Sequence, residues 1–227
     1  LNMSKVEHLK VSVTHASEVA SLQSGDLVLD IGANDGTTLN FFAKDCVRLG
    51  FDPSAKKFSK FIPDDVKIVF DFFSEDLFYK HSSNQKAKLV TSFSMLYDLP
   101  DPLYFSQAVH NILHEDGIWI TEQSYVLRMI EQNSFDTICH EHLEYYGLKQ
   151  MSYIADKVGF DIIDIDFNDI NGGSFVITFK KSNLNFKCKK YLDQLQLELE
   201  KNMQSDFFAT NFFNNVNKIK YDLNNFL

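Results

Sequence analysis

The chain has 227 residues, of which 44% are hydrophobic, and its 22 basic and 31 acidic side chains give a net charge of −9. These values suit one globular domain with appended helices, and they exclude a general nucleic-acid binder, because phosphate contact needs a concentrated basic surface. Three widely spaced cysteines fit neither a disulfide framework nor a four-cysteine zinc site. With no apolar run of about 18 residues and no signal peptide, we expect a cytoplasmic protein with no membrane partner.

Short apolar runs alternate with helical patterns along the first half of the chain. A helix is predicted over residues 4–21, where Val6, Leu9 and Val13 recur at helical spacing. The runs that follow predict strands at 27–31, 46–51, 66–70, 88–94 and 117–123. Each spacer between them is long enough for a crossover helix, as a parallel sheet requires. The spacer after "LYDLPDP" has prolines at its entrance, which is typical of a helix start.

The pattern changes after a further helical stretch at 148–159. Two strand-like runs at 161–167 and 173–179 are joined by the turn-rich sequence "NDINGG", which predicts an antiparallel hairpin. Two amphipathic helices are predicted at 187–204 and 211–227, packing against the body or against another domain. The expected fold is therefore α/β: a doubly wound, Rossmann-like sheet, mostly parallel with an antiparallel C-terminal hairpin, plus terminal helices.

A glycine-bracketed turn, "GANDG", follows the first predicted strand. Ligands of parallel α/β sheets bind at the carboxyl ends of the strands. Gly32 and Gly36 allow a tight turn and a close backbone approach, while Asp30 and Asn34 supply polar groups. Asp52 ends the next strand, 22 residues after Asp30, and an acid at that place is typical of a partner for ribose hydroxyls.

A nicotinamide dinucleotide site is the first alternative for this turn. Such a site needs G-x-G-x-x-G, and a turn with only two glycines serves a pyrophosphate less well. The turn resembles instead the first motif of the class I methyltransferases that use S-adenosyl-L-methionine. The sequences "FDFFS" and "SFSMLYDLPDP", after the third and fourth strands, agree with that resemblance.

The resemblance implies how the cofactor would lie. The glycine turn would face its amino-acid part, and Asp52 would bind the ribose. Asp71 and Phe72 would border the adenine, and Phe93 and Ser94 would face the methionine end. Phe70 and Phe73 are expected to pack in the core instead.

The stretch "EQNSFDTICHEHLEYYGL", at 131–148, concentrates histidines, acids and tyrosines. Read from the residues alone, three interpretations stay open. His140 and His142 could belong to a metal site, although no remote third ligand supports it. The stretch could be a solvated loop. It could also hold a general acid–base pair, because histidine titrates near neutral pH and an adjacent carboxylate can orient it.

Together with "YDLPDPLYF", "GIWITEQSY" and "NDINGGSFVI", this stretch resembles bacterial sugar C-methyltransferases that act on nucleotide-linked keto-deoxyhexoses. The resemblance runs through nearly the whole chain. It implies a small-molecule acceptor, no metal, and a place in surface-polysaccharide or natural-product biosynthesis. Carried over by position, His142 is the base and Glu141 its orienting or substrate-binding partner. Tyr97 and Tyr145 are predicted hydroxyl donors to an enolate oxygen, and Cys139 stands where the family often has an aromatic residue.

Members of that family are longer at both ends, with an N-terminal zinc-binding domain and a C-terminal Rossmann-like domain. By this resemblance the chain corresponds to the catalytic core, with the flanking domains absent from it. We expect an N-terminal helix and linker at 1–24, a methyltransferase domain that binds S-adenosylmethionine at 25–182, and a C-terminal helical extension at 183–227.

Three alternatives remain to this reading. An O-methyltransferase would keep the cofactor and act on a sugar or another small anionic metabolite. A non-catalytic domain would bind the cofactor without transferring the methyl group, although the intact glycine turn and histidine motif speak against it. A dehydrogenase is the weakest alternative, because the glycine spacing is wrong.

Overall fold

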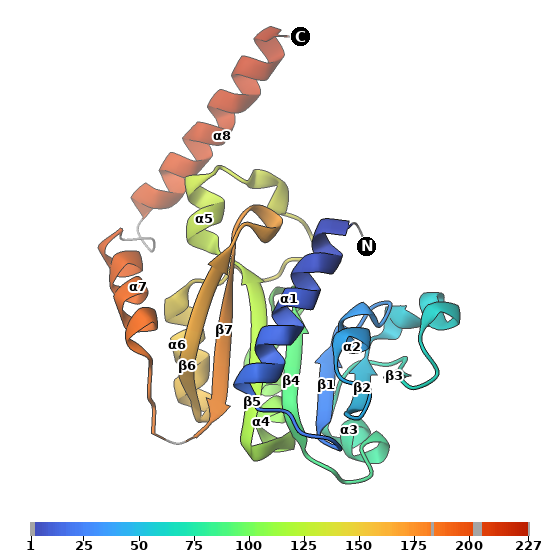
Figure 1. Cartoon of the computed structure of the whole chain (residues 1–227). Coiled ribbons are helices and arrows are strands. Elements are labelled where there is room, and N and C mark those ends of the chain that lie inside the picture. Colours follow the sequence, from blue (N-terminus) through green and yellow to red (C-terminus); the bar gives the residue numbers. More distant parts are fainter. Residues whose placement is uncertain (1–2, 183, 202–205, 227) are drawn as a thin grey trace.

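The computed structural model describes residues 3–182, 184–201 and 206–226. Its centre is a seven-stranded sheet with the order β3-β2-β1-β4-β5-β7-β6 (Figure 1). The strands are β1 Leu27–Ile31, β2 Val47–Phe51, β3 Lys67–Val69, β4 Ala87–Phe93, β5 Leu113–Ser124, β6 Phe160–Asn168 and β7 Ser174–Lys181. The first five strands run parallel, and β7 lies antiparallel between β5 and β6. The predicted fold class is confirmed.

Helices cover both faces of the sheet. They are α1 Met3–Val19, α2 Thr37–Phe41, α3 Glu75–His81, α4 Pro102–Ile112, α5 Val126–Glu131, α6 Leu148–Val158, α7 Lys189–Glu200 and α8 Asp206–Phe226. Successive residues of a strand point to opposite faces. Val28 accordingly packs with α1 and α2, whereas Leu27 and Leu29 pack with α3, α4 and α6. Every residue of β1 is buried, as expected for a central parallel strand.

Two connections differ from the prediction. The spacer between β2 and β3 holds a 3₁₀ helix, η1 Pro53–Phe61, in place of an α-helix. Strand β5 begins at Leu113, directly after α4, and not at residue 117. The first residues of β5 after Leu113 are exposed and polar, so the apolar pattern does not mark them. Three shorter 3₁₀ turns are η2 Leu96–Asp98, η3 Phe135–Thr137 and η4 Ile170–Gly172.

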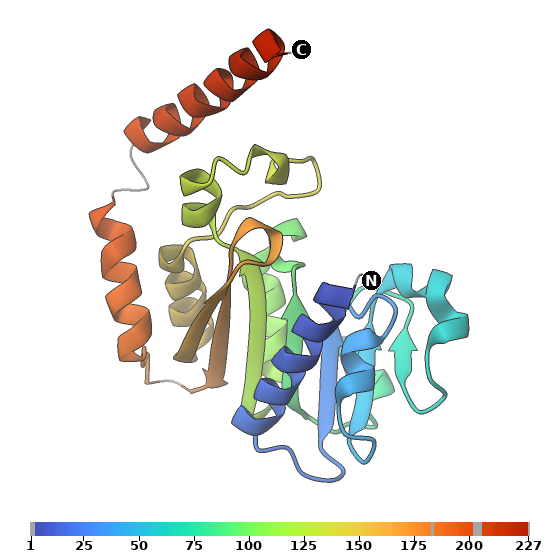
Figure 2. The same cartoon turned by 45° about the horizontal axis from the view of Figure 1, so that its top comes forward.

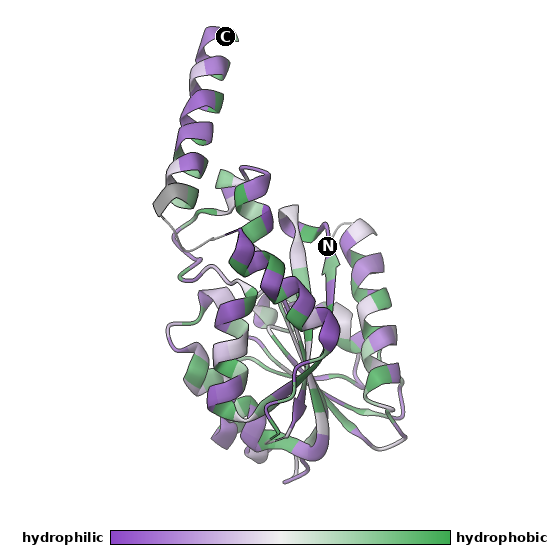
Figure 3. Cartoon of the chain, turned by 90° about the vertical axis from the view of Figure 1, so that its left-hand side faces the viewer, coloured by the Kyte–Doolittle hydropathy of each residue, from purple (hydrophilic) through white to green (hydrophobic). Residues whose placement is uncertain are grey.

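The two ends of the chain differ in how they pack. In α1, Val13 and Ala16 are buried against the sheet. In α7, Tyr191 is fully buried and its hydroxyl donates to the Leu148 carbonyl. Helix α8 points away from the sheet (Figure 2), and hydrophobic residues alternate with hydrophilic ones along it (Figure 3). The last residues predicted for each terminal helix, 202–204 and 227, lie outside the described residues. Among the described helices, none is long and apolar enough to cross a membrane.

Candidate active site

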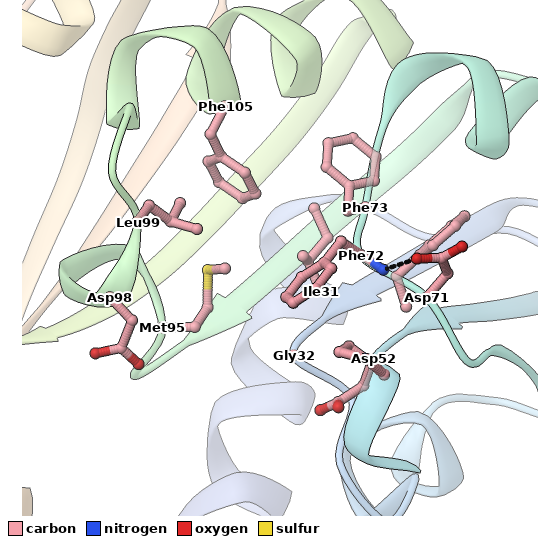
Figure 4. Close-up of a pocket in the computed structure, with 12 residues that line it drawn as sticks. Ile31, Gly32, Asp52, Asp71, Phe72, Phe73, Met95, Asp98, Leu99 and Phe105 are labelled. Carbon is pink, nitrogen blue, oxygen red and sulfur yellow. Dashed lines mark hydrogen bonds between the residues drawn. The ribbon is translucent and has the colours of Figure 1, made fainter. Parts of the chain in front are cut away.

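The carboxyl ends of β1 to β4 open onto a cavity of about 300 Å³ (Figure 4). Gly32 and Asp52 line it from the ends of β1 and β2, and Asp71 and Phe72 line it from the connection after β3. Met95 closes it from the turn after β4. Motifs that are far apart in the sequence are thus brought to one cavity.

The glycine turn after β1 folds back over the end of β2. Gly32 and Gly36 have φ angles of +85° and +80°, in the left-handed region that favours glycine. The N–H groups of Gly32 and Ala33 donate to the Phe51 carbonyl at 2.9 and 3.3 Å. A Cβ atom at position 32 would also reach the Met95 side chain at 3.4 Å. Glycine therefore keeps open the place where the turn's backbone lines the cavity.

Asp52 is fixed by backbone hydrogen bonds at the end of β2. Its Oδ2 accepts from the Asn34 N–H at 2.8 Å, and its Oδ1 accepts from the Ser54 N–H at 2.6 Å. Each carboxylate oxygen has two acceptor sites. Asp52 therefore keeps acceptor capacity for hydroxyl groups of a ligand in the cavity.

Asp30 lies beneath the glycine turn and not on the cavity wall, which differs from its predicted contact with the cofactor. It is 2% exposed, and its Oδ1 accepts from the Thr91 hydroxyl at 2.7 Å. Burial raises the pKa of this carboxyl to about 7, although hydrogen bonds from Thr91 and Thr38 act in the opposite direction. Its observed contacts hold β1 to β4 below the turn.

Aromatic rings form one end of the cavity. Phe72 is 74% exposed at its rim, with its N–H bonded to Asp71 Oδ1 at 2.8 Å. Phe73 packs edge-on against Phe51 and Phe105, with 5.7 Å between ring centroids in each pair, so its predicted core contact is confirmed, although it also lines the cavity. The prediction for Phe70 is wrong, because its side chain is 43% exposed.

A second cavity, of about 280 Å³, continues from the first. The two cavities share four wall residues: Gly32, Asp52, Met95 and Asp98. The second is lined mainly by polar residues, among them Asn34 and Ser94, and Phe93 also belongs to its wall. We refer to the two together as the groove; it is apolar at one end and polar at the other.

The histidine block, residues 139–146, lies beside the groove. Tyr97 in η2 anchors it, because its carbonyl accepts the N–H groups of Leu143 at 2.9 Å and Glu144 at 3.1 Å. The Tyr97 ring also contacts the His142 ring, with 4.3 Å between centroids. Met95 and Asp98, just before and within the same short turn, line the groove. The block is thereby tied to the cavity wall.

His142 has a defined tautomer in this arrangement. Its Nδ1 lies 2.8 Å from the Thr137 carbonyl oxygen. A carbonyl oxygen only accepts, so Nδ1 carries a hydrogen, and in the neutral ring the lone pair is on Nε2. His142 therefore presents Nε2 as a base.

Glu141 does not orient His142, in contrast to the first of its two predicted roles. Its carboxylate lies 3.7 Å from Nε2 of His140, and the two side chains are 68% and 90% exposed. The group that orients His142 is the Thr137 carbonyl. The other predicted role of Glu141, contact with the substrate, stays a prediction.

The two predicted tyrosine donors lie at different distances from the groove. The Tyr97 hydroxyl bonds to the side chain of Ser94, a wall residue of the polar cavity, and burial raises the Tyr97 pKa. The Tyr145 ring lies edge-on to the His142 ring, with 6.4 Å between ring centroids. Burial also raises the pKa of Tyr145. Both hydroxyls thus keep their protons at neutral pH, and Tyr97 is the nearer donor to the groove.

Asp98 is a site residue that sequence reasoning missed. It lines both cavities, and Figure 4 shows it across from Asp52, with Met95 and Gly32 between them. Burial raises the pKa of Asp98, while its electrostatic interaction with His142 acts in the opposite direction. Asp98 is thus the acid that connects the groove with the histidine block. Its place after the fourth strand, in "LYDLPDP", is the signal that could have found it.

Among the described residues, one cluster of histidine and carboxylate side chains, away from the histidine block, has the spacing of a metal site. His15, Asp164 and Asp166 bring ligand atoms within 4.8 Å of one another. Neither His140 nor His142 belongs to this cluster.

Residues 7–165 match a family described as a methyltransferase domain. Together with the sheet order and the glycine turn, this match defines a class I methyltransferase. The chain belongs to this methyltransferase domain family, and its cofactor is S-adenosylmethionine.

Individual proteins are similar to parts of this chain in sequence or in structure. C-methyltransferase NovU from Streptomyces niveus is 28% identical over 177 residues, which cover 76% of this chain and 41% of NovU. The chain thus spans less than half the length of that relative. Plantazolicin methyltransferase BpumL, solved with S-adenosylhomocysteine (SAH) and a pentazolic desmethylPZN analogue, has a TM-score of 0.60 at 11% identity, covering 79% of this chain and 86% of its own. Cyclopropane synthase MmaA2 from Mycobacterium tuberculosis has a TM-score of 0.56 at 12% identity, covering 75% and 83%. At these identities the solved structures share the fold.

The groove fits the cofactor. Its aromatic end suits a planar adenine ring, and the fixed Asp52 carboxylate suits a pair of ribose hydroxyls. Its polar end suits the charged amino-acid part. Along the groove, the wall thus changes from aromatic to acidic to polar, in the same order as the adenine, ribose and amino-acid parts of S-adenosylmethionine.

Proposed function

We propose that this protein is a C-methyltransferase that acts beside the ketone of a nucleotide-linked keto-deoxysugar, in surface-polysaccharide or natural-product biosynthesis. The observation that carries the proposal is the His142 imidazole, whose Nδ1–H is donated to the Thr137 carbonyl, which leaves Nε2 as the nitrogen that can accept a proton. The similarity to a relative named a C-methyltransferase supports the same reaction.

The groove residues would hold the cofactor in order along the strand ends. Asp71 and Phe72 would border the adenine, Asp52 would bind the ribose, and Asn34 and Ser94 would lie at the amino-acid end. S-adenosylmethionine, when bound, supplies an activated methyl group. The chain's own task is then to hold the acceptor carbon in line and to generate a nucleophile.

His142 would generate that nucleophile. Nε2 removes the proton from the carbon next to the ketone, and the electron pair of the broken C–H bond moves to the ketone oxygen to give an enolate. The Tyr97 hydroxyl, which also bonds to Ser94, donates a hydrogen bond to that oxygen, with Tyr145 as the second predicted donor. The enolate carbon is the atom that receives the methyl group, and the proton stays on His142.

Hydrogen exchange tests the proton abstraction without the cofactor. A keto-deoxysugar acceptor is incubated with the protein in deuterated water, and deuterium at the carbon next to the ketone is followed by NMR. We expect incorporation with the unaltered protein and loss of it in His142→Asn. Undiminished exchange in that variant would contradict the role of His142. Methyl transfer to an oxygen, located by NMR of the product, would replace the proposal by O-methylation.

A further inference from the structure

Three elements meet around a buried carboxylate in the polar part of the groove. Glu122, at the end of β5, is 2% exposed. Its Oε2 lies 2.7 Å from Nε2 of His8 in α1 and accepts from the amide of Asn168 in β6 at 3.0 Å. Both His8 and Glu122 belong to the wall of the polar cavity. The proposed reaction uses none of these three side chains.

A carboxylate this deeply buried favours a charged partner, because an unpaired charge is costly away from water. The hydrogen bond from Glu122 raises the pKa of His8 above its usual value, although burial acts in the opposite direction. The His8 side chain is still 19% exposed, so its ring is accessible from the cavity. The arrangement therefore favours the protonated, cationic form of the His8 ring at the polar end of the groove.

The position of this cation matches one part of the cofactor. The polar cavity also contains the glycine turn and Ser94, and it reaches the apolar cavity through Asp52 and Met95. A ligand with its ribose at Asp52 and its adenine among the aromatic rings extends its amino-acid end into the polar cavity. That end carries a carboxylate, which favours a cationic hydrogen-bond donor.

We propose that His8 contacts the α-carboxylate of the cofactor and that Glu122 and Asn168 position its ring. This inference rests on the cofactor orientation given under the proposed function. It makes α1 a part of the cofactor site, although this helix precedes the glycine turn in sequence. Glu122 acts here through His8, as a positioning residue.

Two ligands separate this contact from the rest of the site. SAH carries the amino-acid end, whereas 5′-methylthioadenosine lacks it and keeps the adenosine. In His8→Gln, we expect SAH affinity measured by calorimetry to fall about 10- to 100-fold, the usual value of a hydrogen bond to a charged group. Affinity for 5′-methylthioadenosine should not change. His15→Gln, also in α1 but away from the groove, should leave both affinities unchanged.

The pH profile tests the role of Glu122. The charged groups that face His8 are Glu122 from β5, Lys5 from its own helix, and Asp35, Asp52 and Asp98 on the other cavity walls. SAH affinity should fall as the pH rises through the His8 pKa, and this fall should vanish in His8→Gln. In Glu122→Gln the fall should move to lower pH, because the neutral amide keeps an acceptor but removes the charge.

The outcomes separate the inference from the proposed function. Equal loss of both ligands in His8→Gln, or loss of neither, would overturn the contact while leaving cofactor binding in place. Unchanged SAH affinity together with a raised KM for the acceptor would assign His8 to an anionic group of the acceptor instead. If the unaltered protein bound neither ligand, the cofactor orientation itself would fail.

Discussion

The cofactor side of the groove rests on the ends of buried strands, whereas the histidine block is a largely irregular segment between η3 and α6. On the first side, Gly32 and Asp52 are held by backbone hydrogen bonds between neighbouring strand ends. On the second, the block depends on the Tyr97 carbonyl and on the cap of α6. Cofactor geometry is therefore fixed by the core, and the geometry of the base is fixed by a few separate contacts. Substitutions should be able to damage one side without the other.

The largest effect should come from the base. His142→Asn should lower turnover by about 10²- to 10⁴-fold, the usual contribution of general acid–base catalysis. SAH affinity should stay nearly intact, because His142 is not among the residues that line the groove. Steady-state kinetics and calorimetry measure the two quantities separately.

His140→Asn is the matched control for this prediction. Its side chain is 90% exposed and pairs only loosely with Glu141, at 3.7 Å, so the substitution should have a small effect. Comparable damage from both substitutions, with activity abolished by a chelator, would favour a metal site instead.

A second substitution, at Asp52, should damage the cofactor side of the groove and not the base. Asp52→Ala should weaken SAH binding by about 1–3 kcal/mol, the cost of unpairing a buried hydrogen-bonding group. The same substitution frees the N–H groups of Asn34 and Ser54, so urea unfolding should be measured alongside calorimetry. Asp64→Ala, an exposed acid on the same connection, is the control. Unchanged affinity in Asp52→Ala would mean that the ribose lies elsewhere.

A third substitution, at Glu198, removes the N-terminal cap of α6, the helix that follows the histidine block. Helix α6 begins after Gly147, which has no side chain to cap it. Glu198 in α7 supplies the cap, because its carboxylate accepts the N–H groups of Leu148 at 2.7 Å and Lys149 at 3.3 Å. Glu198→Ala should lower the free energy of unfolding by about 1–2 kcal/mol.

Measuring activity and cofactor binding in the same variant gives a second test of this cap. In Glu198→Ala we expect kcat/KM for the acceptor to fall, because the histidine block ends where α6 begins, while SAH affinity stays the same. Glu200→Ala, two residues further along α7 and exposed, should leave both unchanged. A loss of SAH affinity would mean that the two sides are not independent.

The same contrast explains what the sequence could predict. Buried strands produce apolar runs, so β1 to β7 and the glycine turn were predicted from the residues. The places of Asp71 and Phe72 beside the adenine came only from the resemblance to class I methyltransferases. The orientation of Glu141 was not predictable, because neighbouring side chains in an irregular segment need not point the same way. The pair of His8 and Glu122 joins residues 114 positions apart, a contact that no local pattern records. Asp98 was missed because its role depends on the position of the histidine block.

The smallest effect concerns the pH dependence of stability. The folded protein raises the pKa of His8 above 6.5 through its hydrogen bond to Glu122. A group with a raised folded pKa contributes stability that is fully present below its unfolded pKa and is lost as the pH rises through the folded value. The difference in unfolding free energy between the unaltered protein and His8→Gln should therefore be largest at pH values below about 6.5, and it should shrink as the pH rises above that value. Urea unfolding at a series of pH values measures this difference. A difference that grows with pH would show that His8 stabilises the fold as a neutral ring, in which case the carboxylate of Glu122 is balanced by another group.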